Sequence, residues 1–168
     1  MRVFLLRHGI AEPAGAQNQY QDALRALTAE GISKMAKASQ GLKRMGVNFD
    51  LVASSPLVRA RQTAEIVADA LRIEESLEIW EELLPEASAE SVLEKLGAFR
   101  QRRQVLLVGH QPSMGFLASR LIFGKSTICL DFKKGGLCGV ELTQVPPNQP
   151  ATLLWVLPPK FLRLLGDK

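Results

Sequence analysis

The sequence predicts a three-layer α/β/α sandwich with a mostly parallel central sheet and an antiparallel edge. Residues 3–6 and 105–108 are unbroken apolar runs, as in strands that are buried on both faces of a parallel sheet. Helical patterns lie between these runs, and this alternation favours a sheet covered by helices. With 168 residues and 46% hydrophobic composition, we expect one domain over residues 1–168.

The first half of the chain supplies a further strand and two helices. Thr28 can cap a helix that runs to about Met45 and ends at Gly46. Residues 49–53 (Phe-Asp-Leu-Val-Ala) are the next candidate strand. Ser55 followed by Pro56 then opens a second helix, whose apolar stripe comprises Ala60, Ala64, Val67 and Leu71.

The second half of the chain predicts two helices and the antiparallel edge. Ser88 caps a helix through Leu96, and a further helix follows Pro112. Residues 137–143 and 152–157 can pair as antiparallel strands. The connection between them is rich in turn-forming proline, at Pro146, Pro147 and Pro150.

Charge and composition exclude several function classes. A net charge of +4 suits an acidic partner or a phosphorylated substrate. The densest basic run, residues 100–103, has no interleaved aromatic residue, so we expect no nucleic-acid partner. Cys129 and Cys138 form neither a zinc motif nor a disulfide framework, and we expect reduced thiols. The apolar runs are too short for a signal peptide or a membrane span, which predicts a cytoplasmic protein with no membrane partner.

The chain has two histidines, and both occupy the same setting. His8 and His110 each follow a predicted buried strand, where residues collect at the carboxyl edge of a parallel sheet. Arg59 lies in the first turn of the helix that follows the strand predicted at residues 49–53, so it projects toward the same edge as Arg7. Arginines and helix N-termini bind phosphoryl oxygens. Nearby cations disfavour imidazolium, which should keep His8 neutral and nucleophilic.

Three segments carry a family resemblance. They are residues 7–9 (Arg-His-Gly), 55–64 (Ser-Pro-Leu-Val-Arg-Ala-Arg-Gln-Thr-Ala) and 108–110 (Val-Gly-His). Together they resemble the signature segments of the histidine phosphatase superfamily, which has a phosphoglycerate mutase-like fold. Residues 27–31 (Leu-Thr-x-x-Gly), 82–83 and 109–112 (Gly-His-Gln-Pro) are similar to the SixA-type phosphohistidine phosphatases, a likeness that covers most of the chain.

The resemblance implies a covalent phosphohistidine intermediate on His8. It further implies that the phosphoryl group is bound by Arg7, Gly9, Arg59 and His110, and that no metal or other cofactor is needed. Larger family members use an acidic residue to protonate the leaving oxygen. Glu82 lies nearest that position, with Glu81 and Glu86 as alternatives, and a solvated loop carboxylate is an equally good interpretation of Glu82.

Leaving-group chemistry favours phosphohistidine over a phosphate ester as substrate. An imidazole whose conjugate acid has a pKa of about 6.5 departs with less help than an alkoxide, so a weak general acid is tolerable. The short chain between the second helix and residue 105 also predicts an open, shallow site that admits a protein surface. From the resemblance, the expected partner is a phosphohistidine-bearing protein such as a histidine-phosphotransfer domain of a signalling relay.

Two other functions compete with this prediction. The first is a phosphomonoesterase for a small metabolite, with Glu82 as its acid. The second is a module that binds phosphate without turning it over, which predicts no covalent intermediate. A phosphoglycerate mutase ranks last, because handing the phosphoryl group back to a substrate needs a closed site that excludes water.

Overall fold

A computed structural model describes residues 1–14, 19–125 and 127–167. In these residues six strands form one mixed sheet in the order β3-β2-β4-β1-β5-β6. The strands are β1 (Arg2–Arg7), β2 (Leu51–Ser54), β3 (Leu77–Ile79), β4 (Gln104–Gly109), β5 (Leu137–Glu141) and β6 (Thr152–Leu157). Neighbours from β3 to β1 run parallel, whereas β5 pairs antiparallel with both β1 and β6. The predicted fold class is confirmed.

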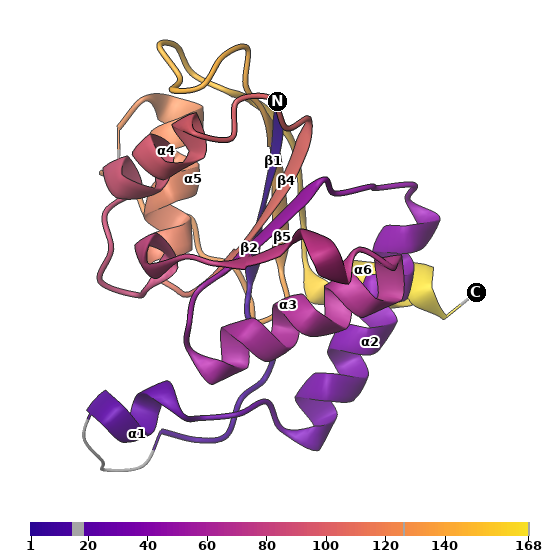
Figure 1. Cartoon of the computed structure of the whole chain (residues 1–168). Coiled ribbons are helices and arrows are strands. Elements are labelled where there is room, and N and C mark those ends of the chain that lie inside the picture. Colours follow the sequence, from indigo (N-terminus) through magenta and orange to yellow (C-terminus); the bar gives the residue numbers. More distant parts are fainter. Residues whose placement is uncertain (15–18, 126, 168) are drawn as a thin grey trace.

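Helices cover both faces of this sheet, as Figure 1 shows. On one face α4 (Ala89–Gly97) and α5 (Ser113–Phe123) pack against alternate residues of β1 such as Val3 and Leu5. On the other face α2 (Ala29–Arg44), α3 (Val58–Leu71) and α6 (Pro159–Gly166) pack against Phe4 and Leu6. A strand alternates its side chains between faces, so the unbroken apolar run feeds both cores.

The central pair of strands sets the position of the two histidines. β1 and β4 lie in parallel register, with Leu6 opposite Val108 and Arg7 opposite Gly109. His8 and His110 are the next residues on the two strands. The sheet therefore delivers both imidazoles to adjacent places at its carboxyl edge. The short helix α1 (Gln19–Ala23) lies beyond the same edge in Figure 1.

Two predicted helix caps are confirmed. The Thr28 hydroxyl accepts a hydrogen bond from the amide of Gly31 at 3.0 Å, and α2 ends with Met45 as its C-cap. The Ser88 hydroxyl accepts one from the amide of Ser91 at 3.1 Å. Such caps satisfy amides that have no partner within the helix, which is why they can be found from sequence.

Two predicted boundaries were displaced, each for a local reason. The strand predicted at residues 49–53 starts at Leu51, because the Asp50 carboxylate accepts hydrogen bonds from the amides of Arg103 and Gln104 at 2.6 and 3.1 Å. The helix predicted to open at Ser55 begins at Val58 without a side-chain cap. The Ser55 hydroxyl accepts a hydrogen bond from the Leu57 amide at 3.3 Å, just before the helix, and is also hydrogen-bonded to His110 at 2.8 Å.

The antiparallel edge is confirmed, although β5 ends at Glu141 rather than residue 143. Three elements were not predicted: β3, α1 and α6. With three residues, β3 is too short to show a period. Helix α6 depends on close approach to α2, since a Cβ at Gly41 would meet the Leu162 carbonyl oxygen at 2.1 Å. No helix among the described residues is long and apolar enough to cross a membrane.

Candidate active site

His8 is fixed at the end of β1 by its backbone and by one ring nitrogen. Its amide donates to the Gly109 carbonyl at 3.0 Å, which continues the β1–β4 ladder. The next amide, that of Gly9, donates to the Thr63 hydroxyl on α3 at 3.0 Å. The ring is 6% exposed, and its Nδ1 lies 2.7 Å from the Gly9 carbonyl oxygen. These contacts hold one edge of the imidazole and leave Nε2 on the other.

His110 lies beside it, at the end of β4. The two rings are 5.1 Å apart between centroids and inclined by 53°. His110 is 2% exposed, and its Nε2 is hydrogen-bonded to the Ser55 hydroxyl at 2.8 Å. Its buried Nδ1 has no partner among the described residues. The sheet thus brings the two histidines into contact range, as the sequence predicted.

Both imidazoles are neutral at physiological pH. Burial, together with the charges of Arg59, Arg7 and Lys134, lowers the pKa of His8 to about 4, although the hydrogen bond that Nδ1 donates to the Gly9 carbonyl opposes the shift. Burial also lowers the pKa of His110 to about 3, with His8 and Arg59 adding to the effect. A neutral imidazole keeps a lone pair for chemistry, so this environment suits a nucleophile.

Arg59 is the second residue of α3 and points into the same site. The Thr63 hydroxyl donates to the Arg59 carbonyl at 2.7 Å and accepts from Gly9, which ties α3 to the residue after His8. The guanidinium is 4% exposed and donates to the Asp22 carbonyl at 2.8 Å and the Asp22 carboxylate at 3.0 Å. Asp22, on α1, is itself held by Arg25 at 2.7 Å. The site is therefore less open at Arg59 than predicted.

Arg7 lines the site from the other side. Its Nη1 donates to the Phe132 carbonyl and lies 3.8 Å from the exposed Asp131 carboxylate. The Nε atoms of Arg7 and Arg59 are both buried without a partner among the described residues. Buried donors without partners are costly, and an anion bound between the two arginines would satisfy them.

Comparisons with known proteins agree with this geometry. The family model of the histidine phosphatase superfamily (branch 1) matches residues 3–84. The phosphohistidine phosphatase SixA of Escherichia coli is 34% identical over 166 residues, which cover 98% of each chain. The chain belongs to the histidine phosphatase superfamily. It is accordingly a phosphatase.

Two further relatives are similar to this chain over nearly its whole length. An uncharacterized protein of Picosynechococcus sp. is 32% identical over 166 residues, covering 96% of this chain and 99% of that protein. A structure of the protein histidine phosphatase SixA complexed with tungstate matches with a TM-score of 0.84 and 30% identity, covering 96% of this chain and 99% of that one.

Glu82 lies apart from the four cationic and imidazole groups of this histidine phosphatase. It belongs to a 3₁₀ turn (Glu81–Leu83) after β3, a strand held by the Trp80 amide donating to the Ser54 carbonyl at 2.8 Å. Its carboxylate is paired with Lys95 of α4 at 3.6 Å. Glu82 therefore lies near the carboxyl edge, and its ion-pair partner is Lys95 on a helix and not His8.

Sequence reasoning missed three residues that shape the site. Asp22 anchors Arg59, Thr63 links α3 to Gly9, and Lys134 lies near enough to His8 to lower its pKa. Thr63 falls inside the family segment at residues 55–64, so its position within a shared motif was a usable signal. Nothing local marks Asp22 or Lys134.

The described residues hold no group of three or more histidine, cysteine, aspartate or glutamate side chains that could bind a metal ion. The two cysteines are free, as expected, with Cys138 buried and Cys129 exposed. Burial raises the pKa of the Cys138 thiol to about 11, so it stays protonated and unreactive. Partial burial and the charge of Asp131 also raise the pKa of the Cys129 thiol, so neither thiol is activated as a nucleophile.

Proposed function

We propose that this histidine phosphatase removes the phosphoryl group from phosphohistidine on proteins, by a covalent intermediate on His8. The observation that carries the proposal is the setting of His8. Its ring is buried, neutral and oriented by the Gly9 carbonyl, beside a second histidine and two arginines. Such a site combines a nucleophile with fixed positive charge for the transferring phosphoryl group.

The attacking atom follows from the hydrogen bond at Gly9. A carbonyl oxygen only accepts hydrogen bonds, so the Nδ1 atom 2.7 Å away carries the proton. In a neutral ring the other nitrogen, Nε2, then has the lone pair. We therefore assign Nε2 of His8 as the nucleophile.

The reaction then balances in two displacements. The Nε2 lone pair of His8 attacks phosphorus, and the bond from phosphorus to the substrate nitrogen breaks. The far nitrogen of the substrate ring carries its proton, so that ring departs as neutral imidazole. Water next attacks the phosphorus on His8, and the electron pair of the breaking bond returns to Nε2. The proton that water loses goes to solvent, and inorganic phosphate leaves.

The residues expected to hold the phosphoryl group are Arg7, Gly9, Arg59 and His110, and we propose Arg7, Arg59 and His110 as its direct ligands. Phosphoryl transfer needs positioning and charge stabilisation more than covalent help from the protein. Arg7 and Arg59 offer permanent charge, and each keeps a buried Nε without a partner among the described residues. The Gly9 amide donates to the Thr63 hydroxyl and its carbonyl accepts from Nδ1 of His8, so Gly9 contributes by orienting the ring that accepts the phosphoryl group.

The substrate class rests on the similarity to SixA. The relative that is 34% identical carries the name phosphohistidine phosphatase, and a similar SixA structure contains tungstate, a tetrahedral oxyanion like phosphate. By the same similarity we propose a phosphohistidine-bearing signalling protein as partner, such as a histidine-phosphotransfer domain. A cytoplasmic location and independence of metal stay predictions from the sequence.

Trapping the intermediate tests the proposal. The wild-type protein and His8→Ala are mixed briefly with a peptide that carries ³²P-phosphohistidine, quenched in base and mapped by peptide mass. We expect acid-labile, base-stable label on His8, and neither label nor phosphate release with His8→Ala. A circular dichroism spectrum matching wild type shows that the variant is folded.

Other results identify the competing functions. Faster release of phosphate from sugar phosphates than from the phosphohistidine peptide would assign a small-molecule phosphomonoesterase. Phosphate binding by calorimetry without turnover of either substrate would assign a binding module. Label on any residue other than His8 would contradict the mechanism.

A further inference from the structure

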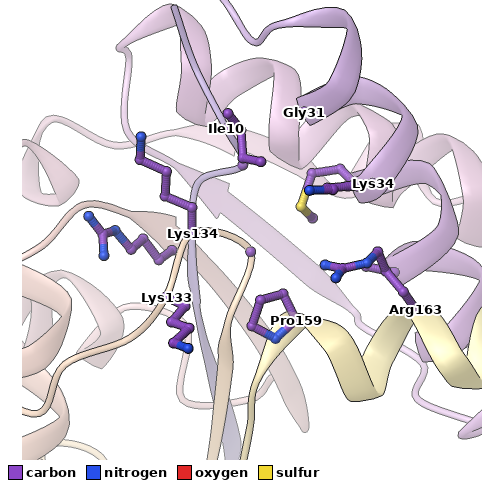
Figure 2. Close-up of a pocket in the computed structure, with 12 residues that line it drawn as sticks. Ile10, Gly31, Lys34, Lys133, Lys134, Pro159 and Arg163 are labelled. Atoms are coloured by element: carbon purple, nitrogen blue, oxygen red, sulfur yellow. The ribbon is translucent and has the colours of Figure 1, made fainter. Parts of the chain in front are cut away.

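A second basic feature lies next to the active site. A cavity of about 430 Å³ is bordered by Arg7 and Gly9, the two residues that flank His8. Figure 2 shows it between the segment after β1, helix α2, the turn before β5 and the start of α6. We call it the cationic cavity, because its lining includes Arg7, Lys34, Lys133, Lys134 and Arg163.

The charge of this cavity is compensated only in part, with Arg7 lying 3.8 Å from the exposed Asp131 carboxylate. Its lining contains five cationic residues and no carboxylate. Lys34 is paired with Glu30 one turn earlier on α2, and Arg163 is close enough to lower the pKa of Glu30 together with Lys34. By contrast, Lys133 and Lys134 are exposed and make no ion pair with any described residue. Like charges gathered around one hollow favour an anionic occupant.

The turn that carries the two lysines is fastened to the nucleophile's strand. The Gly135 amide donates to the carbonyls of Arg7 and His8 at 3.0 and 3.1 Å, and the Arg7 amide donates to the Gly136 carbonyl at 3.1 Å. Gly135 has a φ of +76°, a conformation that favours glycine. Lys133 and Lys134 are thereby held beside the active site by backbone hydrogen bonds.

The lining of the cavity combines apolar and cationic residues. Ile10, Met35, Ala38 and Pro159 contribute to the lining between the charged residues. The cations come from β1, α2, the turn before β5 and α6, so they surround the hollow instead of converging on one point. That spacing suits several carboxylates carried on short apolar stems better than one compact anion.

We propose that the cationic cavity binds acidic side chains of the protein substrate that lie next to its phosphohistidine. This inference rests on the proposed function and names the surface chemistry of its partner. With the phosphoryl group at His8, the neighbouring residues of the substrate extend over Arg7 into the cavity. Aspartate or glutamate at those positions meets the unpaired charges of Lys133 and Lys134, with Arg163 across the cavity.

The chain offers a matched control at the opposite end of the sheet. A cavity of about 430 Å³ there is lined by Arg2, Arg100, Arg102 and Arg103, together with Glu141. Arg2 begins β1 and Arg7 ends it, so this second basic surface lies a full strand away from His8. Replacing arginines there changes the net charge equally without touching the site.

The experiment compares Lys133→Glu/Arg163→Glu with Arg100→Glu/Arg102→Glu. Both double variants lower the net charge by the same amount. The substrates are two phosphohistidine peptides that differ only in three flanking residues, glutamate in one and glutamine in the other. We expect wild type and the control variant to show a KM about 10-fold lower for the glutamate peptide, with a preference that shrinks in high salt. The Lys133→Glu/Arg163→Glu variant should lose or reverse that preference.

Several outcomes would overturn the inference. It fails if wild type shows no preference, or if both double variants lose the preference equally. A third test uses inorganic tripolyphosphate as a competitor of the glutamine peptide. If it competes in wild type but not in Lys133→Glu/Arg163→Glu, and wild type does not prefer the glutamate peptide, then the cavity binds a small polyanion and the inference fails. If the Lys133→Glu/Arg163→Glu variant does not fold, Lys133→Gln/Arg163→Gln replaces it in the same comparison. Failure of wild type to hydrolyse either peptide instead contradicts the proposed function.

Discussion

His8 and His110 occupy matching places on neighbouring strands and yet are held differently. Both follow a central parallel strand, both are buried, and both have a lowered pKa. The Nδ1 of His8 faces a backbone carbonyl, which can only accept, whereas Nε2 of His110 faces the Ser55 hydroxyl, which can accept or donate. One ring thus has a fixed tautomer and the other does not, so equal positions in the fold do not imply equal chemical roles.

Replacing His110 gives the sharpest test of this difference. Loss of one group that contacts the phosphoryl group in the transition state costs about 10²–10³-fold in kcat. We expect His110→Asn to be slowed by this amount and still to form the acid-labile label on His8. Rapid-quench labelling measures both quantities. Ser55→Ala, which removes the hydroxyl that contacts His110 and the Leu57 amide, should lose about 10-fold or less, as expected for a positioning contact. Label on His110 in His8→Ala would reverse the assignment.

Titration of the two rings tests the lowered pKa that they share. The folded pKa values of about 4 for His8 and about 3 for His110 lie below the value of 6.5 for an unfolded histidine. The unfolded chain therefore binds more protons as the pH falls from 6.5 toward 4, and stability present above pH 6.5 is lost across that window. We expect the free energy of unfolding to be lower at pH 4.5 than at pH 7.5 by about 5 kcal/mol, with roughly half of that from each ring.

Nuclear magnetic resonance checks this directly, because a chain with two histidines gives two ring signals. Single His8→Ala and His110→Asn variants assign each signal to its ring. Neither signal should shift between pH 5.5 and 8. A titration midpoint near pH 6.5 for either ring would show that burial does not control it.

Glu82→Gln probes the smallest expected effect. Glu82 is paired with Lys95 of α4 and not with either histidine. If Glu82 protonates leaving groups, as the family resemblance implies, the variant should slow hydrolysis of a phosphate ester several-fold and of phosphohistidine by less than about two-fold. Comparing kcat on p-nitrophenyl phosphate, an alkyl phosphate and the phosphohistidine peptide measures this. Equal loss on all three would remove the leaving-group argument, and Lys95→Gln controls for loss of the ion pair.

Features that depend on neighbouring residues could be predicted closely. The apolar runs of β1 and β4 each fill a strand, and Thr28 and Ser88 act as caps because a cap is a contact across three residues. The convergence of both histidines also followed from local reasoning, since two parallel strands of equal phase must end together.

Features that depend on distant residues could not be predicted. Ser55 looked like a helix cap, but its hydroxyl is used by His110, which lies 55 positions away. Asp22 reaches Arg59 across 37 positions and covers part of a site expected to be open. Phe49 fitted a strand pattern because it is apolar, although it packs in a connection against Phe4, with ring centroids 5.1 Å apart.

The sequence alone determined the layered fold, the pairing of His8 with His110 at one edge, and the family to which the chain belongs. Those properties can be predicted from hydrophobic periodicity, helix caps and short motifs, because each of these signals involves residues that are close in sequence. Only the tertiary structure decided which nitrogen of His8 is free, what holds Arg59, and that Lys133, Lys134 and Arg163 surround one hollow. Each of these depends on side chains that meet only when helices pack on the sheet, and no local pattern encodes that meeting.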